Sequence, residues 1–280
     1  MSYLELTRVS GIFTAVSNVL LGYFLSYNGE DPFPSLLYLR TATSLLYCGG
    51  MALNDFFDFK SDVKEHPKRV IPSGRMKRRD AGIFGFSAVL VACIVASFAG
   101  MTSFAIAILI SVLIVVYNRF AKDVLILGAL NMATIRFFNV ILGSSTTAVN
   151  ELVIASASAI FIFVFGITLM SRKEDDLLRK YTAPRLGMVG AVVAYVLVLH
   201  ITGVLTGEYI VLFVILFAAL ALLPYRMKSA KVAQLVGSSV IAIILLDATL
   251  ISGTGQILFA FAVALLYIPS FALSRVIKVS

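Results

Sequence analysis

Three polar side chains recur at four-residue intervals where an apolar stretch ends: Asn54, Asp58 and Asp62. If the preceding helix continues through them, this spacing places all three on one helix face, over about 12 Å of its length. Carboxylate and amide oxygens suit Mg²⁺, which takes carboxylates together with substrate phosphate oxygens and water. The spacing therefore predicts a magnesium site, although acids at a solvated helix end can show the same pattern.

Bases follow these acids within the same segment. Lys68 and Arg69 precede an Ile-Pro-Ser-Gly turn at 71–74, and further Lys and Arg residues continue to Arg79. Basic side chains bind phosphate oxygens through charge-assisted hydrogen bonds, while the acids hold a metal that the same oxygens share. Acids and bases in one connecting segment therefore predict a diphosphate site.

A second charged segment, 171–185, also follows an apolar stretch. Ser171 and Asp175 are four residues apart, and Glu174 and Asp176 are further carboxylates beside them. Two such segments suggest two half-bundles that offer matching sites. The alternative is a charged helix end whose acids and bases pair in solvent.

The elements that must position these residues are membrane helices. The chain has 280 residues, of which 60% are hydrophobic and 14% charged, and its mean hydropathy is +0.97. Its apolar runs of about 17–24 residues match the thickness of a bilayer core. We expect an all-α polytopic membrane protein, a bundle of nine or ten transmembrane helices with cap loops, and Gly49 and Gly50 predict close helix packing. The candidate spans are 9–27, 34–53, 81–98, 102–118, 124–146, 152–170, 186–204, 208–224, 232–251 and 256–273.

The distribution of bases predicts the orientation of the bundle. Apart from Arg40 and Arg136, every Lys and Arg lies at a terminus or in alternate connections between spans, and the intervening connections carry acids instead. By the positive-inside rule both termini and the charged segments face the cytoplasm. We therefore expect a multi-pass protein of the cytoplasmic membrane. The net charge of +8 reflects this topology and does not indicate a nucleic-acid partner.

The first charged segment resembles a known family motif. The sequence NDFFDFKSD followed by KRVIPSGRMKRRDA resembles the first aspartate-rich motif of the UbiA family of intramembrane prenyltransferases, in which Val70 replaces a usual Pro. The family's second motif, D-x-x-x-D, corresponds here to Ser171-x-x-x-Asp175, as in a subgroup with an S-R-x-E stretch. The resemblance runs in order over nearly the whole chain. It implies one transmembrane prenyltransferase domain over 1–280, with cap loops at about 54–80, 118–123 and 171–185.

The resemblance also implies roles for individual residues. The sequence YNRFAKD at 117–123 resembles a Y-x-x-x-x-K element, in which Tyr117 lines the pocket and Lys122 binds the diphosphate. The expected catalytic residues are Asp58, Asp62, Asp175, Lys122 and Tyr117. The expected metal ligands are Asn54, Asp58, Asp62, Glu174 and Asp175. The expected contacts to the diphosphate and pocket are Arg69, Lys122, Arg172, Ser171 and Asn18.

Arg136 lies within an apolar span and needs its own explanation. A charge at the bilayer centre costs about 2.5–3.5 kcal/mol on insertion scales, so it faces a cavity or a partner. Arg136 is either a further contact to the diphosphate or acceptor, or a structural ion pair with Asp247.

Together these residues predict a Mg²⁺-dependent enzyme in the lipid bilayer. It would transfer an isoprenyl group from an allylic isoprenyl diphosphate, through an allylic cation, to an aromatic or lipid-alcohol acceptor. Because Ser171 replaces an acid, a family member that binds isoprenoids without catalysis is one alternative. A cation-coupled transporter with acidic gates is another. A CDP-alcohol phosphotransferase is disfavoured because its D-G-x-x-A-R signature is absent from the sequence.

Overall fold

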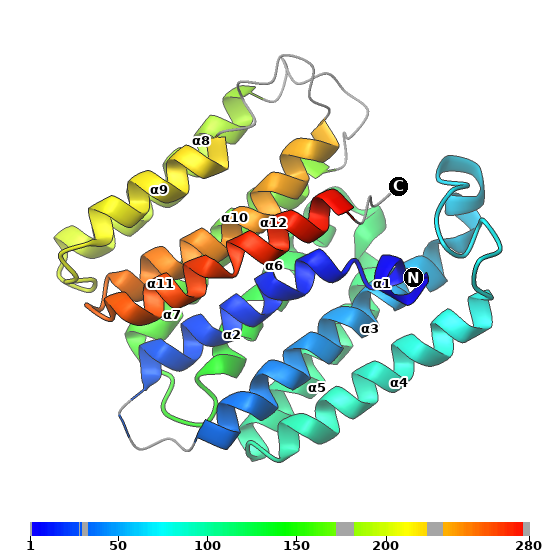
Figure 1. Ribbon diagram of the computed structural model, residues 1–280, viewed down its shortest axis with the longest axis horizontal. Coiled ribbons are helices and arrows are strands. Elements are labelled where there is room, and N and C mark those ends of the chain that lie inside the picture. Colours follow the sequence, from blue (N-terminus) through cyan, green and yellow to red (C-terminus); the bar gives the residue numbers. More distant parts are fainter. Residues whose placement is uncertain (1, 28, 30–32, 172–181, 223–231, 277–280) are drawn as a thin grey trace.

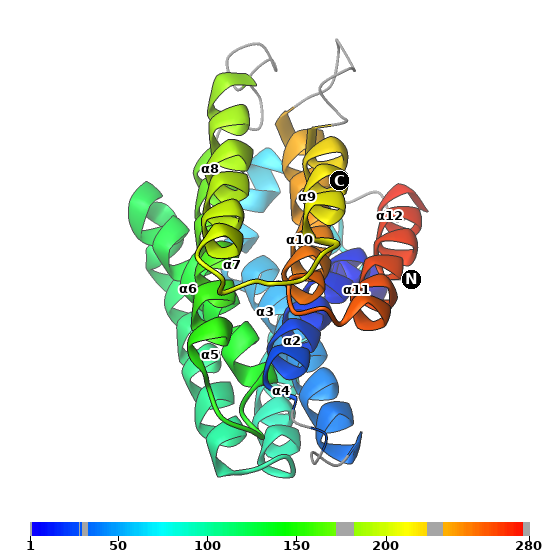
Figure 2. The same ribbon diagram turned by 90° about the vertical axis from the view of Figure 1, so that its left-hand side faces the viewer.

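A computed structural model describes residues 2–27, 29, 33–171, 182–222 and 232–276. Every regular element in these ranges is a helix, and the long helices run side by side as a bundle (Figures 1 and 2). The α-helices are α1 Ser2–Leu6, α2 Ile12–Ser26, α3 Phe33–Glu65, α4 Arg78–Ser97, α5 Met101–Arg119, α6 Leu125–Gly143, α7 Glu151–Ser171, α8 Thr182–Ile201, α9 Ile210–Leu222, α10 Val232–Ser252, α11 Ile257–Leu265 and α12 Tyr267–Val276. Two 3₁₀ helices, η1 Val9–Gly11 and η2 Ala121–Asp123, join them.

Each predicted span overlaps one of the helices α2 to α10, except the last, which overlaps both α11 and α12. Within the described ranges, 7 helices are long and apolar enough to cross a membrane, and α9 and α10 are shorter apolar helices. The all-α multi-pass architecture is therefore confirmed, whereas the number of nine or ten crossings stays a prediction. The seven are Val9–Ser26, Arg78–Ser97, Met101–Arg119, Leu125–Gly143, Glu151–Ser171, Pro184–Ile201 and Ile257–Val276.

Helix α3 is 33 residues long and extends well beyond the span predicted at 34–53. The sequence from Leu53 to Glu65 contains no glycine or proline, so nothing interrupts the helix until Pro67 disfavours helical backbone before it. The segment predicted as a cap loop, 54–80, is thus helical as far as Glu65 and again from Arg78. This extension supplies the regular helix face that the predicted metal site requires.

The last predicted span divides into α11 and α12 at Leu266. Pro269 lies in the first turn of α12 and has no N–H to donate to the Leu265 carbonyl, so a continuous helix would lose a hydrogen bond there. The Ser270 hydroxyl donates to the Ser10 carbonyl at 2.8 Å. The final helix is therefore attached to the N-terminal segment of the chain.

Helices α2 and α6 form the centre of the bundle. They contribute to both large buried apolar clusters, one shared with α7 to α11 and the other with α3 to α5. Their backbones approach closely at two glycines: a Cβ on Gly22 would lie 1.9 Å from the Val140 oxygen, and one on Gly143 would lie 2.1 Å from the Val19 oxygen. Small residues permit this approach, which is common between membrane helices.

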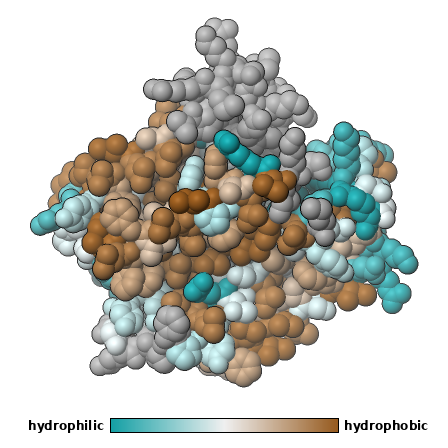
Figure 3. Space-filling model, in the orientation of Figure 1, coloured by the Kyte–Doolittle hydropathy of each residue, from teal (hydrophilic) through white to brown (hydrophobic). Residues whose placement is uncertain are grey.

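The surface agrees with a membrane environment. Figure 3 shows apolar residues covering much of the visible face, with hydrophilic residues gathered on the right. In the same orientation, α1, the end of α3 and the start of α4 lie on that side (Figure 1). The charged segment that begins at Asn54 therefore lies at one end of an apolar bundle.

Candidate active site

Two of the predicted metal-binding acids form ion pairs with two of the predicted diphosphate-binding bases. The Asp58 carboxylate on α3 contacts Lys122 Nζ on η2. Arg69 Nη1, in the turn that follows α3, donates to Asp62 Oδ1 at 2.7 Å. The face of α3, its following turn and the connection between α5 and α6 therefore meet at one place. All four side chains were predicted from sequence to belong to one site.

Asp62 has the features of a metal ligand that still lacks a full set of partners. It is 3% exposed, and its Oδ2 has no hydrogen-bond partner among the residues that the structure describes. A buried carboxylate oxygen without a donor is energetically costly, and a hard cation such as Mg²⁺ relieves that cost. Asn54 and Asp58 precede Asp62 along the same helix face.

The described residues supply part of a magnesium coordination sphere. Among them, no group of three or more His, Cys, Asp or Glu side chains could hold a metal. Asp58 and Asp62 would therefore need the Asn54 amide, water and phosphate oxygens to complete six ligands. Mg²⁺ commonly binds in this way, through one or two carboxylates plus substrate phosphates. The residues present thus fit an ion that is shared with a diphosphate.

Asn118, which the sequence analysis did not single out, orients Asn54. Asn54 Nδ2 donates to Asn118 Oδ1 at 3.0 Å, and Asn118 Nδ2 donates to the Ile114 carbonyl at 3.0 Å and the Gly50 carbonyl at 3.4 Å. These carbonyls fix the Asn118 amide with its oxygen toward Asn54. Asn54 therefore uses its NH₂ group and keeps its oxygen for another ligand. The available signal was the position of Asn118 directly after Tyr117 in the YNRFAKD sequence.

The remaining acid of the first motif, Asp55, points to a different partner. Arg8 Nη2 donates to Asp55 Oδ1 at 3.3 Å, which attaches the N-terminal segment to α3. Asp55 lies beyond the predicted span, and burial raises the pKa of its carboxyl above the ordinary value by more than Arg8 lowers it. The Asp55 carboxyl therefore serves to hold the N-terminal segment against α3.

The other predicted site residues lie on α5, at the end of α7 or in the second motif. Tyr117 lies half-buried near the end of α5. The Ser171 hydroxyl, at the end of α7, donates to the Thr168 carbonyl at 2.9 Å within its own helix. Arg172, Glu174 and Asp175 lie outside the residues that the structure describes, so the arrangement of the second motif stays a prediction.

A polar network crosses the centre of the bundle. Arg136 on α6 donates to Asn18 Oδ1 at 3.2 Å and to Thr14 Oγ1 at 3.0 Å. Asn18 Nδ2 in turn donates to both carboxylate oxygens of Asp247 on α10, at 3.0 and 2.9 Å. The structure thus links Arg136 to Asp247 through Asn18 and joins α2, α6 and α10. The network holds the Arg136 guanidinium in place. It is compatible both with a substrate contact and with a structural pairing of Arg136 with Asp247 through Asn18.

Arg185 is a second residue that sequence reasoning missed. It lies in the first turn of α8, at the end of the predicted cap loop, and it is 1% exposed. Its Nη2 donates to the Ala221 carbonyl at the end of α9, and also lies 3.3 Å from Ser238 Oγ on α10. A cation suits the last turn of a helix, where carbonyl groups lack intrahelical partners. Arg185 therefore joins α8, α9 and α10.

Comparisons with known proteins identify the family of this chain. The chain belongs to the UbiA prenyltransferase family, whose model matches residues 15–227. A curated relative, the digeranylgeranylglyceryl phosphate synthase of Methanococcus aeolicus, is 32% identical over 132 residues, which is 47% of this chain and 47% of that protein. The chain thus spans about half the length of the curated relatives it matches.

Solved structures share the fold over nearly the whole chain. A UbiA homolog from Archaeoglobus fulgidus covers 94% of this chain and 99% of its own, with a TM-score of 0.64 and 12% identity. A UbiA homolog from the same organism bound to DMAPP and Mg²⁺ covers 99% of this chain and 100% of its own, with a TM-score of 0.59 and 14% identity. At 12% and 14% identity, the similarity to these two structures establishes the fold alone.

Proposed function

We propose that this protein catalyses the Mg²⁺-dependent transfer of an isoprenyl group from an allylic isoprenyl diphosphate to a lipid alcohol within the membrane. The observation that carries the proposal is the meeting of Asp58 with Lys122 and of Asp62 with Arg69 at the charged end of an apolar bundle. A metal and a diphosphate need these polar groups, and an isoprenoid chain needs the apolar helices beside them. Family membership supports the same reaction class.

The side chains of the site have complementary roles in this proposal. Asn54, Asp58 and Asp62 would hold Mg²⁺ together with acids of the second motif. The ion would neutralise charge on the diphosphate oxygens. Lys122 and Arg69 would donate to the same oxygens and stabilise the negative charge that grows on the leaving group. Their ion pairs with the acids keep both cations at the site before a substrate arrives.

The reaction then follows from bond breaking at the allylic carbon. The C1–O bond of the donor breaks, and its electron pair leaves with the diphosphate. The surrounding apolar helices exclude water, which would otherwise capture the allylic cation. The hydroxyl oxygen of the acceptor forms the new bond to C1 and loses its proton, and the released diphosphate is a base able to take it.

The acceptor class is the least direct part of the proposal. The sequence alone leaves an aromatic ring and a lipid alcohol equally open. The name of the curated relative, a digeranylgeranylglyceryl phosphate synthase, favours a lipid alcohol that carries a glyceryl phosphate. The DMAPP and Mg²⁺ in the Archaeoglobus fulgidus structure support the donor class and the cofactor. The distribution of bases favours a site that opens to the cytoplasm.

One observation favours a second function, in which the protein binds isoprenoids without transferring them. Ser171 stands where the family motif has an acid, and its hydroxyl donates to a carbonyl of its own helix. A neutral hydroxyl is a weaker magnesium ligand than a carboxylate. The second metal-binding motif would then be too weak to support ionisation of the donor.

The test is diphosphate release by the purified protein from C5 to C20 isoprenyl diphosphates, with and without Mg²⁺ and with aromatic and glycerol-lipid acceptors. The diagnostic variant is Asp58→Asn. Asp80→Asn is the matched control, because Asp80 is an exposed acid in the first turn of α4 at the same end of the bundle. Release that requires both Mg²⁺ and Asp58, and that persists in the control, supports the proposal.

Two other results would replace the proposal. Donor binding without release, under every acceptor condition, would favour the isoprenoid-binding function. The absence of both donor binding and diphosphate release would contradict both functions. It would favour cation-coupled transport instead.

A further inference from the structure

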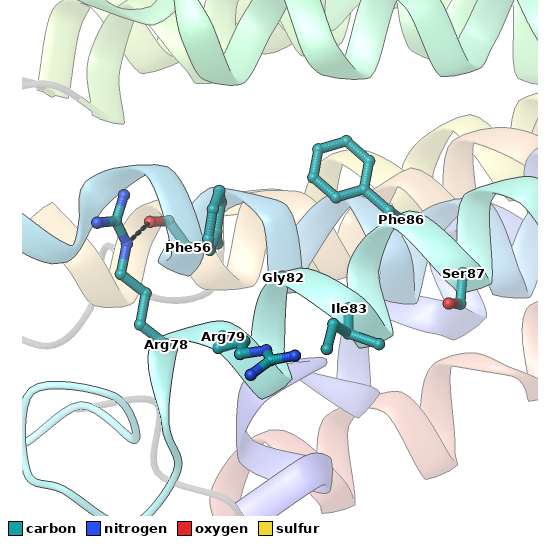
Figure 4. A pocket seen from close by; sticks show the side chains of 7 residues that line it. All are labelled: Phe56, Arg78, Arg79, Gly82, Ile83, Phe86 and Ser87. Atoms are coloured by element: carbon teal, nitrogen blue, oxygen red, sulfur yellow. Dashed lines mark hydrogen bonds between the residues drawn. The ribbon is translucent and has the colours of Figure 1, made fainter.

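A groove lies on the outer face of the bundle, between the end of α3 and the start of α4. Its volume is about 650 Å³, and its lining includes Phe56 from α3 and Arg78, Arg79 and Phe86 from α4 (Figure 4). None of these four residues belongs to the proposed active site. The groove combines two arginines with aromatic and aliphatic side chains on a surface that borders the membrane.

Close packing of α3 against α4 builds the floor of the groove. A Cβ on Gly82 would lie 2.9 Å from the Phe56 ring, so the glycine gives this ring room to lie against α4. Phe86 then packs edge-on against Phe56, with ring centroids 6.4 Å apart. The aromatic floor is therefore a consequence of the glycine in the second turn of α4.

Arg78 is held in a fixed position at the charged end of this floor. Its Nε donates to the Phe56 carbonyl at 3.0 Å, and its guanidinium lies 4.7 Å from the centre of the Phe56 ring and 5.5 Å from that of Phe59. Among the described residues, neither terminal NH₂ group of this guanidinium donates a hydrogen bond, so both can bind an anion. Figure 4 shows this guanidinium beside the Phe56 carbonyl, with Arg79 and Ile83 next along α4.

The groove continues into an apolar stripe. Ile83, Phe86 and Leu90 recur at helical spacing on α4, and they are 55%, 49% and 63% exposed. In a protein that spans a bilayer, such a stripe contacts acyl chains. Arg79 is exposed at the start of the same helix, where the positive end of the helix dipole also favours an anion. Positive charge and apolar surface thus follow the order of a phospholipid, first the headgroup and then the chains.

We propose that this groove binds one anionic phospholipid of the surrounding leaflet. Its phosphate would be held by Arg78 and Arg79, and an acyl chain would lie along Ile83 and Phe86. Charge complementarity selects an anionic headgroup, because Lys77, Arg78 and Arg79 are consecutive bases. The bound lipid would anchor the α3–α4 connection, which carries Arg69, the ion-pair partner of Asp62, against the membrane.

The test is native mass spectrometry of the full chain in detergent, titrated with phosphatidylglycerol or phosphatidylcholine. The wild type is expected to retain phosphatidylglycerol in preference to phosphatidylcholine. Arg78→Gln with Arg79→Gln should weaken phosphatidylglycerol retention by about tenfold, as expected for lost charge-assisted bonds to phosphate. Lys60→Gln with Lys64→Gln is the matched control, because it removes two charges from exposed sites near the end of α3.

Two further variants separate the groove from general effects. Arg79→Gln alone tests the headgroup contact without removing the Arg78 bond to Phe56, and it should weaken retention in a protein of unchanged melting temperature. Phe86→Ala should weaken retention, whereas Phe98→Ala, at the far end of α4 and 67% exposed, should not.

Three results would overturn the proposal. The first is equal retention of phosphatidylglycerol by the wild type and both arginine variants. The second is an equal loss in the paired lysine variant, which would indicate a diffuse charge effect. The third is full displacement of the lipid by millimolar glycerol phosphate, which would show an anion site without a role for the acyl chain.

Discussion

Asn18 on α2 donates its side-chain amide to both carboxylate oxygens of Asp247 on α10, at 3.0 and 2.9 Å. The two residues are 229 positions apart, and both are 0% exposed. Asn18 also accepts a hydrogen bond from Arg136 at 3.2 Å. One amide therefore satisfies an acid and a base together in the apolar interior, where an unpaired charge would be costly.

Asn18→Ala is therefore expected to destabilise the folded bundle. The change removes both hydrogen bonds that Asn18 donates to the buried Asp247 carboxylate and should cost about 2 kcal/mol, typical of an unsatisfied buried group. Thermal unfolding in detergent measures the effect. Thr134→Ala is the control, because its hydroxyl bonds to the Leu130 carbonyl within α6. Equal melting temperatures for the two variants would contradict a structural role for the Asn18 network.

Asn118→Ala is expected to weaken magnesium use without unfolding the protein. Asn118 fixes the amide of Asn54, and loss of a partner that orients a metal ligand typically costs about 10–100-fold in affinity or activity. The Mg²⁺ concentration for half-maximal diphosphate release should rise, while the melting temperature in EDTA changes little.

Asn150→Ala provides the matched control for Asn118. Asn150 Oδ1 accepts a hydrogen bond from the Val153 N–H at the start of α7, so its loss affects a helix cap. The control should lower stability without a change in Mg²⁺ dependence. An Asn118 variant with the wild-type Mg²⁺ dependence would show that Asn54 needs no orienting partner.

Metal binding can be tested apart from catalysis. A ligand that binds the folded state alone raises the free energy of unfolding by about 2.7 kcal/mol at one hundred times its dissociation constant. Mg²⁺ together with a non-ionisable thio analogue of an isoprenyl diphosphate should therefore raise the melting temperature of the wild type. Asp62→Asn should abolish this rise, and Asp80→Asn should retain it. Stabilisation that survives in Asp62→Asn would place the metal elsewhere.

The buried carboxyl of Asp55 is expected to make the stability of the folded protein depend on pH. Burial raises the pKa of its carboxyl in the folded protein above the unfolded value, so the folded state favours the protonated form. The contribution of Asp55 to stability is therefore complete below the unfolded pKa and decreases as pH rises through the folded pKa. Asp55→Asn mimics the protonated form and should lose less stability than the wild type between pH 4 and pH 7.

Melting temperatures of both proteins at several pH values in this range measure that difference. Asp80→Asn, which removes an exposed acid, should follow the wild type. A wild-type curve that runs parallel to the Asp55→Asn curve would contradict the effect of burial on Asp55.

The parts of the site that the sequence could predict depend on local regularity. Asn54, Asp58 and Asp62 share a face because a helix repeats every 3.6 residues, and α3 does continue through them. Lys122 was assigned through the family motif, and the structure places it against Asp58. Asn118 was not predicted because its role depends on the tertiary contact between α5 and α3, which no local pattern encodes.

The same limit applies to helix packing. Gly49 and Gly50 were both predicted to allow close contact, and Gly49 does so, since a Cβ there would lie 2.8 Å from Val89 Cγ2. At Gly50 the nearest atom would be 3.4 Å away, which is close to ordinary contact. Gly22 and Gly143 allow a much closer approach than Gly49, because they lie where α2 and α6 meet at the centre of the bundle.

Gly22→Ala is expected to disrupt the packing of α2 against α6. Its Cβ would lie 1.9 Å from the backbone oxygen of Val140, so α2 and α6 would have to separate. Overpacking of this kind costs about 1–3 kcal/mol or more. Gly190→Ala, in α8, is the matched control because a Cβ there meets nothing within 4 Å. That control should be stabilised by about 0.5–1 kcal/mol, the helix preference of alanine over glycine. Thermal unfolding of both variants measures these opposite changes in stability. A Gly22→Ala protein as stable as Gly190→Ala would contradict the close contact between α2 and α6.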